Sequence, residues 1–334
     1  MRAMVYAGPG DLRPTELADP TLGPRDILVR IEACGICGSD VSSYAHGHYA
    51  VPGQVLGHEM SSIVEQLGSA LSGVHPGQRV AVLTARSCGR CPYCDDGRPY
   101  LCDGSRERSI GYGAPGGFAD VMVVRDVTID HDIVPVPPDV ETDDLVWVEP
   151  LSVAVHAVRR AGLDHSSGPT LVLGAGSVGL CVLAAAKAAG ASGLVVVEPR
   201  ADRLAAAASM GVTVAHPSEL TSADLGLAGV IDTSGAAAAI SSALPHLAPG
   251  GRLTLVGLGD GAVPWPAGGI DVVTSFAFDH EDFHAAVDHI VSGRVRLAPF
   301  ISHRYGLTEV GEAITASAHD PSVTKAVVYP GTRA

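Results

Sequence analysis

The sequence predicts an α/β protein of two domains, one β-rich and one built on a doubly wound parallel sheet. Three observations support this. The first 150 residues contain short β-type runs, the chain from residue 151 alternates apolar strands with helices, and a glycine fingerprint joins the first such strand to its helix. The 334 residues are 46% hydrophobic and 17% charged, which supplies a large core and argues against disorder.

The β-rich part is indicated by three apolar runs bounded by turn residues: Ile27–Ala33, Arg79–Leu83 and Phe118–Val124. Glycine and proline between such short runs are typical of a partly closed barrel, because they allow the chain to turn sharply from one strand to the next. We therefore expect a barrel-like domain over residues 1 to about 150.

Beyond residue 151 the strand and helix signals alternate, which predicts a parallel sheet. Strands are expected at 170–173, 193–197, 230–232 and 252–256. Helices are expected at 178–189, in the alanine-rich segment that ends at 208, and at 236–247. After residue 283 we expect a helix at 284–292, then strands, a further helix and a last strand within 324–329 that returns to the first domain.

The charge balance restricts the partners. A net charge of −14 argues against nucleic acid and anionic membranes, which require a basic face, and suits a neutral or cationic small substrate as well as plain solubility. The apolar stretch 171–190 is long enough to span a membrane, but its glycines and Lys187 favour a strand, a turn and a packed helix. Because the N-terminus lacks a signal-peptide pattern, we expect a cytoplasmic protein whose seven cysteines are metal ligands or free thiols.

A dinucleotide site is predicted by Gly174, Gly176 and Gly179, which form G-x-G-x-x-G between a strand and a helix. These glycines permit the tight turn, the approach of a pyrophosphate and close packing of the helix on the strand. The next strand ends in Glu198, whose carboxylate can accept hydrogen bonds from ribose hydroxyls and would repel a 2′-phosphate. This favours NAD, while the nearby Arg203 keeps NADP as the alternative.

A catalytic zinc site is predicted by Cys37 and by the adjacent pair His58 and Glu59. A thiolate, an imidazole and a carboxylate make a three-ligand set that leaves one position open for water or substrate. Glu149 is a candidate third or exchanging ligand, and Glu59 then lies outside the metal or alternates with it. The carboxylate of Asp40 can accept the second ring N–H of His58 and so fix its tautomer.

A structural zinc site is predicted by four cysteines with the spacing C-x-x-C-x-x-C-x7-C, namely Cys88, Cys91, Cys94 and Cys102. Four thiolates close a tetrahedral site and leave no position for a substrate. We expect this zinc to hold together a lobe of about residues 86–104, with an iron–sulfur site or disulfides as the alternatives. The remaining Cys34 and Cys181 are expected to be buried and inert.

Together these stretches resemble the zinc-containing medium-chain alcohol and polyol dehydrogenases, nearest to the sorbitol and threonine dehydrogenase branch. The resemblance extends over essentially the whole chain and rests on Cys37-Gly-Ser-Asp, Gly57-His-Glu, the four-cysteine lobe, Gly116-Gly-Phe-Ala, Glu149-Pro-Leu-Ser-Val and the glycine loop. It implies a GroES-like catalytic domain of residues 1–150 and 284–334, interrupted by a Rossmann cofactor domain of residues 151–283. It also implies two zinc ions per subunit and a homodimer or homotetramer.

The resemblance also implies roles for single residues. Its zinc set is Cys37, His58 and Glu149, with Glu59 beside them. Further cofactor contacts are expected in or after the Rossmann strands, at Ser177, Val178, Thr233, Val256, Gly257 and Leu258, the last three along the nicotinamide. By the same implication Lys325 approaches the pyrophosphate.

Proton release is expected to begin at Ser39, two residues after the zinc cysteine. Many relatives carry a histidine three residues further on, where this chain has Ser42. The sequence leaves two exits open, one through ribose and water and one through His46 or His48.

The expected function is a zinc-dependent oxidoreductase that transfers a hydride from a secondary alcohol to NAD. The run from Tyr44 to Tyr49 offers hydroxyl and imidazole groups that suit a small polyhydroxylated or amino-hydroxylated substrate, such as a polyol, sugar, amino sugar or aminocyclitol. A redox-neutral lyase or epimerase that retains NAD is the alternative, and stoichiometric release of NADH distinguishes the two. A non-catalytic zinc and nucleotide binder is disfavoured because Cys37, Ser39 and His58 are all present.

Overall fold

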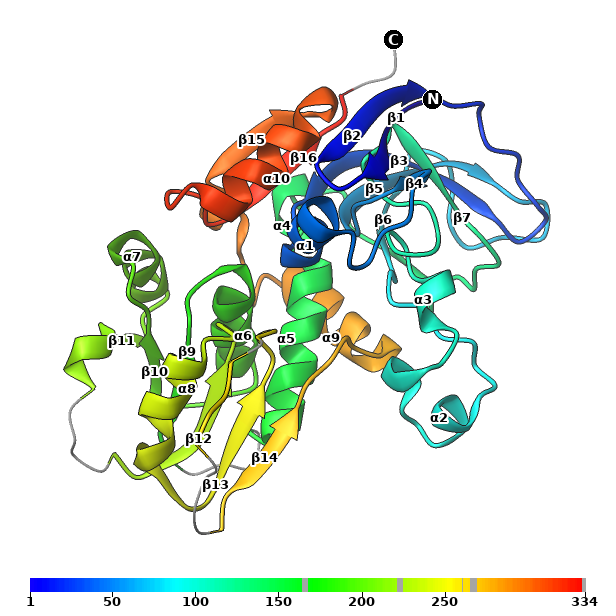
Figure 1. Ribbon diagram of the computed structural model, residues 1–334. Coiled ribbons are helices and arrows are strands. Elements are labelled where there is room, and N and C mark those ends of the chain that lie inside the picture. Colours follow the sequence, from blue (N-terminus) through cyan, green and yellow to red (C-terminus); the bar gives the residue numbers. More distant parts are fainter. Residues whose placement is uncertain (164–167, 221–224, 260, 265–268, 332–334) are drawn as a thin grey trace. The chain divides into compact units, whose positions relative to one another are not determined.

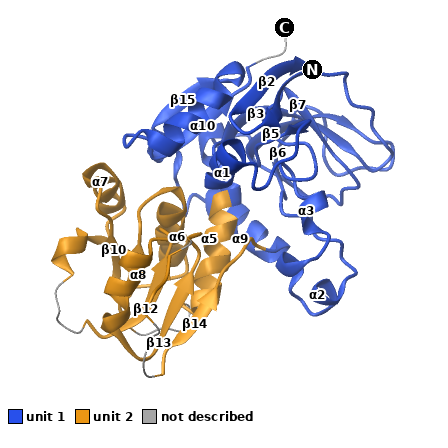
Figure 2. Cartoon of the chain, in the orientation of Figure 1, with its two compact units in different colours: residues 1–149, 279–334 blue, residues 150–278 orange. Residues whose placement is uncertain are grey.

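The computed structural model describes residues 1–163, 168–220, 225–259, 261–264 and 269–331 (Figure 1). The chain divides into two compact units (Figure 2). Unit 1 contains residues 1–149 and 279–334, and unit 2 contains residues 150–278. The return to unit 1 thus precedes helix α9 (His280–Val291), which was expected to start at 284. Its earlier start follows from the N-cap Asp279, which accepts hydrogen bonds from the N–H groups of Glu281 and Asp282.

Unit 1 is built on two sheets that share one apolar core. In the larger sheet the strand order is β15 (His303–Gly306), β16 (Ala326–Tyr329), β3 (Ile27–Gly35), β5 (Glu59–Leu67), β6 (Arg79–Val82) and β8 (Ile133–Pro135), and β7 (Val121–Val124) also pairs with β3. The smaller sheet contains β2 (Asp11–Glu16), β1 (Arg2–Gly8) and β4 (Gln54–Val55). Side chains from both sheets, including Met4 and Ile31, lie in the same buried cluster. The three strands expected in this part are confirmed as β3, β6 and β7.

Strand β3 organises this unit because it pairs with three other strands. It runs antiparallel to β5, β7 and β16, and most of its side chains are buried. At its carboxyl end Gly35 is in register with both Glu59 of β5 and Val327 of β16. The expected return of the last strand to the first domain is therefore confirmed, and three distant segments meet at the end of β3.

Short helices complete unit 1. Two of the longer ones, α1 (Gly38–His46) and α10 (Val310–His319), contact each other, and α4 (Thr142–Leu145) contacts β3, β5 and α9. The lobe that carries the four cysteines has only α2 (Pro92–Asp95), the 3₁₀ turn η1 (Pro99–Leu101) and α3 (Ser105–Arg108). Within the lobe 86–104 the single buried residue is Cys102. Since this lobe has almost no apolar core of its own, it needs another source of stability. Two further 3₁₀ turns, η4 (Ala298–Phe300) and η5 (Leu307–Glu309), flank β15.

Unit 2 contains a sheet in which every pair of neighbouring strands is parallel. The order is β11 (Thr213–Ala215), β10 (Leu194–Val197), β9 (Thr170–Leu173), β12 (Leu227–Asp232), β13 (Leu247–Leu255) and β14 (Asp271–Thr274). In chain order this is 3-2-1-4-5-6, the doubly wound arrangement whose ligand crevice lies at the carboxyl ends of the two central strands, β9 and β12. The helices between the strands are α6 (Ser177–Ala188), α7 (Ala201–Ser209) and α8 (Ala237–Ala243). The predicted alternation of strand and helix is confirmed.

Two details of unit 2 concern the sequence predictions. The apolar stretch 171–190 forms β9, the glycine turn and α6, whose residues from Gly179 to Ala186 are buried. In the described ranges, no helix combines the length and the apolarity that crossing a bilayer requires. The helix expected at 236–247 is shorter, because Pro245 lacks an N–H and the chain continues as the 3₁₀ turn η3 (Leu244–His246). Helix α5 (Val148–Ala161) and the 3₁₀ turn η2 (Pro217–Glu219) complete the elements.

Candidate active site

The glycine fingerprint forms the turn between β9 and α6, at the carboxyl end of a central strand. Gly174 has a φ of +94°, a conformation that favours glycine, and a Cβ at Gly179 would overlap the carbonyl oxygen of Gly174. Gly176 is the N-cap of α6, and Ser177 and Val178 form its first turn. The partial positive charge of a helix N-terminus therefore lies where the sequence predicts the pyrophosphate.

The acidic residue expected to bind the ribose lies beside this turn. Glu198 follows β10 and is buried, and its carboxylate accepts hydrogen bonds from the N–H groups of Ala175 at 2.8 Å and Arg200 at 3.0 Å. A carboxylate has further lone pairs, so it can still accept bonds from a ribose. The guanidinium of Arg203 lies next to Gly176, with Nη1 3.3 Å from the position of a Cβ there.

The carboxyl end of β12 adds a second turn to this site. Thr233 follows this strand, and its hydroxyl donates to the carbonyl oxygens of Leu173 at 2.8 Å and Gly174 at 3.2 Å. The buried Asp232 accepts from the N–H groups of Ser234 and Gly235, each at 3.0 Å. Sequence reasoning did not include Asp232 in the site. An aspartate directly before Ser-Gly at a strand end is the turn signal that would have indicated it.

The residues expected along the nicotinamide follow β13 at the same edge of the sheet. The N–H groups of Val256 and Gly257 donate to the carbonyl oxygen of Asp232 at 2.9 and 3.0 Å. A Cβ at Gly257 would overlap the backbone of Gly235, so these two turns are in close contact. Leu258 is 75% exposed. The structure thus brings the expected cofactor residues of unit 2 to one edge of the sheet.

In unit 1 the structure brings together Cys37, His58 and Glu59, whose ligand atoms all lie within 4.8 Å of one another. Cys37 is the N-cap of α1, and its N–H donates to Asp40 at 2.9 Å. Glu59 is the first residue of β5. Because β5 and β3 are antiparallel neighbours, the start of β5 lies beside the end of β3, from which Cys37 follows.

Gly35 leaves room for this group. A Cβ at this position would overlap Oε2 of Glu59 and would lie 2.8 Å from Cε of Lys325. Sequence reasoning gave Gly35 no role. The close approach of two charged side chains to one backbone position is visible only after β3, β5 and β16 have paired.

Glu149, the candidate third or exchanging ligand, lies near the group of Cys37, His58 and Glu59. It lies in the first turn of α5 and is not part of the group that contains Cys37, His58 and Glu59. Its carboxyl group is near enough to His58 and Cys37 for their charges to affect its pKa. Glu59 joins the group through the register of β5 against β3, which pairs it with Gly35, whereas Glu149 comes from a separate segment.

Lys325, which the resemblance expects near the pyrophosphate, makes its contacts within unit 1. It precedes β16, is fully buried, and forms an ion pair with Glu59. Its Nζ also donates to the carbonyl oxygen of Ile36 at 3.3 Å and lies 5.2 Å from the centroid of the Trp147 ring. Its ammonium is therefore directed at the metal-ligand group.

The electrostatics of the group call for a cation. Burial, together with the negative charges of Glu59 and Asp40, raises the pKa of the Cys37 thiol to about 12. Burial likewise raises the pKa of Glu149 to about 8, and the charge on Cys37 adds to this rise while His58 opposes it. Burial lowers the pKa of His58, but nearby carboxylates, Asp40 first, produce a net rise. A dication at this position would stabilise the thiolate and the carboxylates together, so the donor set fits zinc.

The histidine has the orientation expected of a metal ligand. Its Nδ1 is buried with no hydrogen-bond partner in the described part of the chain, and the nearest carboxylate oxygen of Asp40 is 3.9 Å away. The expected interaction of Asp40 with this ring nitrogen is thus present as a charge contact, longer than a hydrogen bond. Nε2 of His58 points away from Asp40, toward the hydroxyl of Tyr112.

Tyr112 completes this site and was missed by sequence reasoning. Its hydroxyl is 2.9 Å from Oγ of Ser39 and 3.4 Å from Nε2 of His58, and its ring lies 5.0 Å from the His58 ring. Burial raises the pKa of Tyr112 well above its usual value, so the phenol keeps its proton. No motif marks this residue, since it reaches the site from a loop between the four-cysteine lobe and β7.

The histidines considered for proton release lie at the end of α1 and just beyond it. Oγ of Ser42 and Nδ1 of His48 are 2.8 Å apart, and the rings of His46 and His48 are 5.2 Å apart. An imidazole from the following loop thus reaches Ser42, the position at which relatives were expected to carry their histidine. Tyr44 points elsewhere, because its hydroxyl donates to the carbonyl oxygen of Gly10 at 3.0 Å.

The second predicted metal group is also assembled. The four Sγ atoms of Cys88, Cys91, Cys94 and Cys102 lie within 4.8 Å of one another. Hydrogen bonds, the first from the Cys94 N–H, lower the pKa of Cys91 to about 6, and burial raises that of Cys102 to about 11. None of the seven cysteines, all of which lie in described ranges, forms a disulfide. A closed set of four thiols in a lobe without a core fits a structural zinc.

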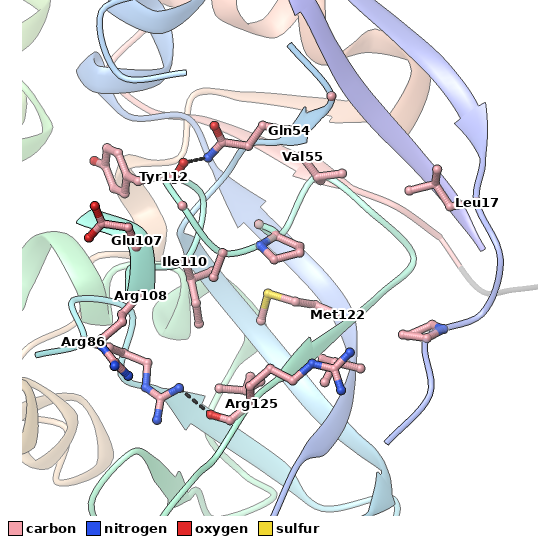
Figure 3. A pocket seen from close by; sticks show the side chains of 18 of the residues that line it. Leu17, Gln54, Val55, Arg86, Glu107, Arg108, Ile110, Tyr112, Met122 and Arg125 are labelled. Carbon is pink, nitrogen blue, oxygen red and sulfur yellow. Dashed lines mark hydrogen bonds between the residues drawn. The ribbon is translucent and has the colours of Figure 1, made fainter. Parts of the chain in front are cut away.

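A cavity of about 700 Å³ in unit 1 is distinct from both metal groups. Its lining includes Ile110, Met122 and Arg125 but none of the residues predicted for a site (Figure 3). Tyr112 also lines this cavity. Its carbonyl oxygen accepts a hydrogen bond from the side-chain amide of Gln54, and its ring points away from Met122 (Figure 3). Two arginines of the cavity are engaged in the fold: Arg86 donates to the carbonyl oxygen of Arg125, and Arg125 pairs with Asp26.

Comparison with known proteins identifies both parts of the chain. Residues 23–138 match the alcohol dehydrogenase GroES-like domain, and residues 177–292 match the zinc-binding dehydrogenase family. The chain is 31% identical to a sorbitol dehydrogenase of Arabidopsis thaliana, covering 92% of this chain and 89% of the relative. It is also 31% identical to an L-idonate 5-dehydrogenase of Vitis vinifera, covering 92% of this chain and 88% of the relative.

Solved structures agree. An alcohol dehydrogenase from Thermus sp. ATN1 superposes with a TM-score of 0.87 at 28% identity, covering 98% of this chain and 99% of the other. L-idonate 5-dehydrogenase of Escherichia coli superposes with a TM-score of 0.88 at 25% identity, covering 98% and 97%. A zinc-binding dehydrogenase from Sinorhizobium meliloti bound to NADP gives a TM-score of 0.87 at 27% identity, covering 98% and 99%. With a GroES-like domain, a Rossmann domain and these relatives, the chain belongs to the zinc-containing medium-chain alcohol and polyol dehydrogenases.

Proposed function

We propose that this enzyme transfers a hydride from a secondary alcohol of a small polyhydroxylated or amino-hydroxylated substrate to NAD. The observation that carries the proposal is the group of Cys37, His58 and Glu59, three donors of the kind that hold a catalytic zinc. None of the relatives compared above is a lyase or an epimerase, so the redox-neutral alternative gains no support from them.

The two units supply different parts of the proposed site. Unit 1, the GroES-like domain, supplies the zinc ligands, and unit 2, the Rossmann domain, supplies the cofactor site. Cys37 and His58 would hold the metal with Glu59 or Glu149 as the exchanging carboxylate, and Lys325 holds Glu59 by its charge. When bound, the zinc supplies Lewis acidity that lowers the pKa of an alcohol.

The residues of this chain move the proton. The hydroxyl groups of Ser39 and Tyr112 contact each other, and that of Tyr112 lies next to Nε2 of His58. Ser39 is the first acceptor of the proton. The bond between Ser42 and His48 supports His48 over His46 as the exit, with ribose and water as the other route.

We propose NAD as the cofactor because of Glu198. Its carboxylate is held against the glycine turn by two backbone N–H groups, and its charge would repel the 2′-phosphate of NADP. Arg203 beside Gly176 and the NADP-bound relative are the reasons to test both cofactors.

We further propose a second zinc, held by the four cysteines of the lobe, and a homodimer or homotetramer. Strand β14 is an edge of its sheet in the described residues, and Val272 on it and Phe276 just after it are 49% and 62% exposed. An apolar sheet edge of this kind favours pairing with another chain. A cytoplasmic location is proposed because both groups require reduced thiols.

The test is a screen for NADH and NADPH production over polyols, sugars, amino sugars and aminocyclitols. We expect NADH release with at least one secondary alcohol and two zinc ions per chain by elemental analysis. Cys37→Ser should abolish turnover but leave NAD binding, measured by calorimetry, unchanged. The proposal fails if no alcohol in the screen yields reduced cofactor, or if zinc-free protein retains full activity.

A further inference from the structure

Tyr112 places a hydroxyl group between Ser39 and His58. Its hydroxyl lies between Oγ of Ser39 at 2.9 Å and Nε2 of His58 at 3.4 Å, and the residue is half-buried. Nδ1 of His58 faces Asp40, which leaves Nε2 as the nitrogen that points to the side of Tyr112. Any group that approaches Nε2 of His58 therefore also approaches the Tyr112 hydroxyl.

The backbone on both sides of Tyr112 is held in place. Its carbonyl oxygen accepts a hydrogen bond from the side-chain amide of Gln54, and its N–H donates to Ser109 at 3.3 Å. Gly111 has a φ of +79°, and a Cβ there would lie 2.7 Å from the carbonyl oxygen of Gly57. A Cβ at Gly113 would overlap the backbone of Glu107. A side chain anchored in this way is preorganised, so little ordering cost remains when it binds a ligand.

The chemistry of the surrounding groups explains why a tyrosine matters here. Glu59, Glu149 and Asp40 accept hydrogen bonds when ionised, and a metal-bound Cys37 donates none. Ser39 and Tyr112, by contrast, carry hydroxyl groups, and each of these can donate and accept. A substrate with a hydroxyl next to the reacting carbon can thus exchange hydrogen bonds with this pair.

We infer that Tyr112 is a substrate-contacting residue that selects alcohols carrying a second hydroxyl next to the oxidised one. The inference rests on the proposed dehydrogenase function and adds the residue that sets its substrate preference. A simple secondary alcohol would leave the Tyr112 hydroxyl facing an apolar group. A site built to bond a hydroxyl discriminates against analogues that lack it.

The experiment compares 2,3-butanediol with 2-butanol, which share a carbon chain and differ by one hydroxyl. We would measure kcat/KM for both with the wild type and with Tyr112→Phe, which keeps the ring on His58. The expected result is a wild type that prefers the diol and a variant whose preference falls about tenfold, mainly through the KM of the diol. Calorimetric titration of zinc-loaded protein with the diol should show the same loss of affinity without turnover.

The matched control is Tyr305→Phe, because Tyr305 lies on β15 of the same unit, its ring stacks on His303 rather than on a site residue, and the change is chemically the same. This variant should keep the wild-type preference. Zinc content and zinc affinity, measured by competition with a chelator, should be unchanged in Tyr112→Phe. If Tyr112→Phe instead weakens zinc binding and slows both alcohols equally, the residue only positions His58 and the inference is overturned.

The remaining outcomes are also decisive. A wild type without preference for the diol, or a Tyr112→Phe variant that keeps it, overturns the inference while the dehydrogenase function stands. A wild type that produces reduced cofactor from no alcohol overturns the proposed function itself.

Discussion

Replacing Lys325 by methionine tests the buried charge cluster most directly. The ammonium of Lys325 and the carboxylate of Glu59 form an ion pair in which the side chains are 0% and 2% exposed, so water hardly screens it. Removing one partner of such a pair leaves an uncompensated buried charge, at a cost of about 3–5 kcal/mol. At about 2–4 °C per kcal/mol for a domain of this size, the melting temperature of zinc-free protein should fall by roughly 6–20 °C.

Zinc changes this expectation in a defined way. A dication on the group of Cys37, His58 and Glu59 would itself compensate the carboxylate, so Lys325→Met should cost less in zinc-loaded protein. Calorimetric unfolding of zinc-free and zinc-loaded protein measures both values. In the zinc-free protein, the double variant Lys325→Met with Glu59→Gln should recover most of the loss, because no buried charge remains.

Lys187→Met is the matched control, since it removes the same group from an exposed position in unit 2. A change of about 0.5 kcal/mol or less is typical of such surface sites. The reasoning is refuted if Lys325→Met is no more destabilising than Lys187→Met, or if zinc leaves its cost unchanged.

Three further predictions follow from the other sites. Glu198→Gln keeps an acceptor for the Ala175 N–H but removes the charge, so the ratio of kcat/KM for NADP to that for NAD should rise about tenfold or more in steady-state assays; an unchanged ratio would exclude Glu198 from cofactor choice. Cys91→Ser should reduce bound zinc from two ions to one and make residues 86–104 sensitive to proteolysis, and retention of both ions would contradict the four-thiolate site. At Asp26, burial is outweighed by hydrogen bonds from the N–H groups of Asp126 and Gly23 and from Arg125, so the pKa of this carboxyl lies below its usual 3.8. Its stabilising effect is therefore present above pH 3.8 and is lost as the pH falls through the lower folded-state pKa, and Asp26→Asn should flatten the acid side of the stability–pH curve while lowering stability at pH 7.

Much of the fold could be predicted from the sequence because local signals carried it. The alternation of strands and helices in unit 2 and the glycine turn depend on periodicity and on glycine chemistry within short segments. The boundary at α9 was placed four residues late, since the cap at Asp279 is a weaker signal than the apolar residues that follow it. The four-cysteine group could be predicted for the same reason as the glycine turn. Its residues are close together in the chain, so their spacing alone indicates the geometry of the site.

The sequence predicted only part of the composition of the zinc group. Cys37, His58 and Glu59 were identified by residue type, but which carboxylate joins them depends on the register of β3 against β5. The partner of Glu59 depends on β16, which brings Lys325 to the end of β3 from near the other end of the chain. Tyr112 carries no signal of its own, because its role comes from a loop held by contacts with Gln54 and Gly57.

The sequence by itself determined the chemistry available to this protein: a nucleotide turn, two sets of metal ligands and the family to which they belong. Only the tertiary structure decided which of those groups touch, placing Glu59 beside Cys37 and His58, turning Lys325 toward that carboxylate and setting Tyr112 over the histidine ring. The physical reason is that spacing along the chain fixes distances only within one turn or loop. Contacts between distant segments depend on strand pairing and on the space left where a residue such as Gly35 has no side chain.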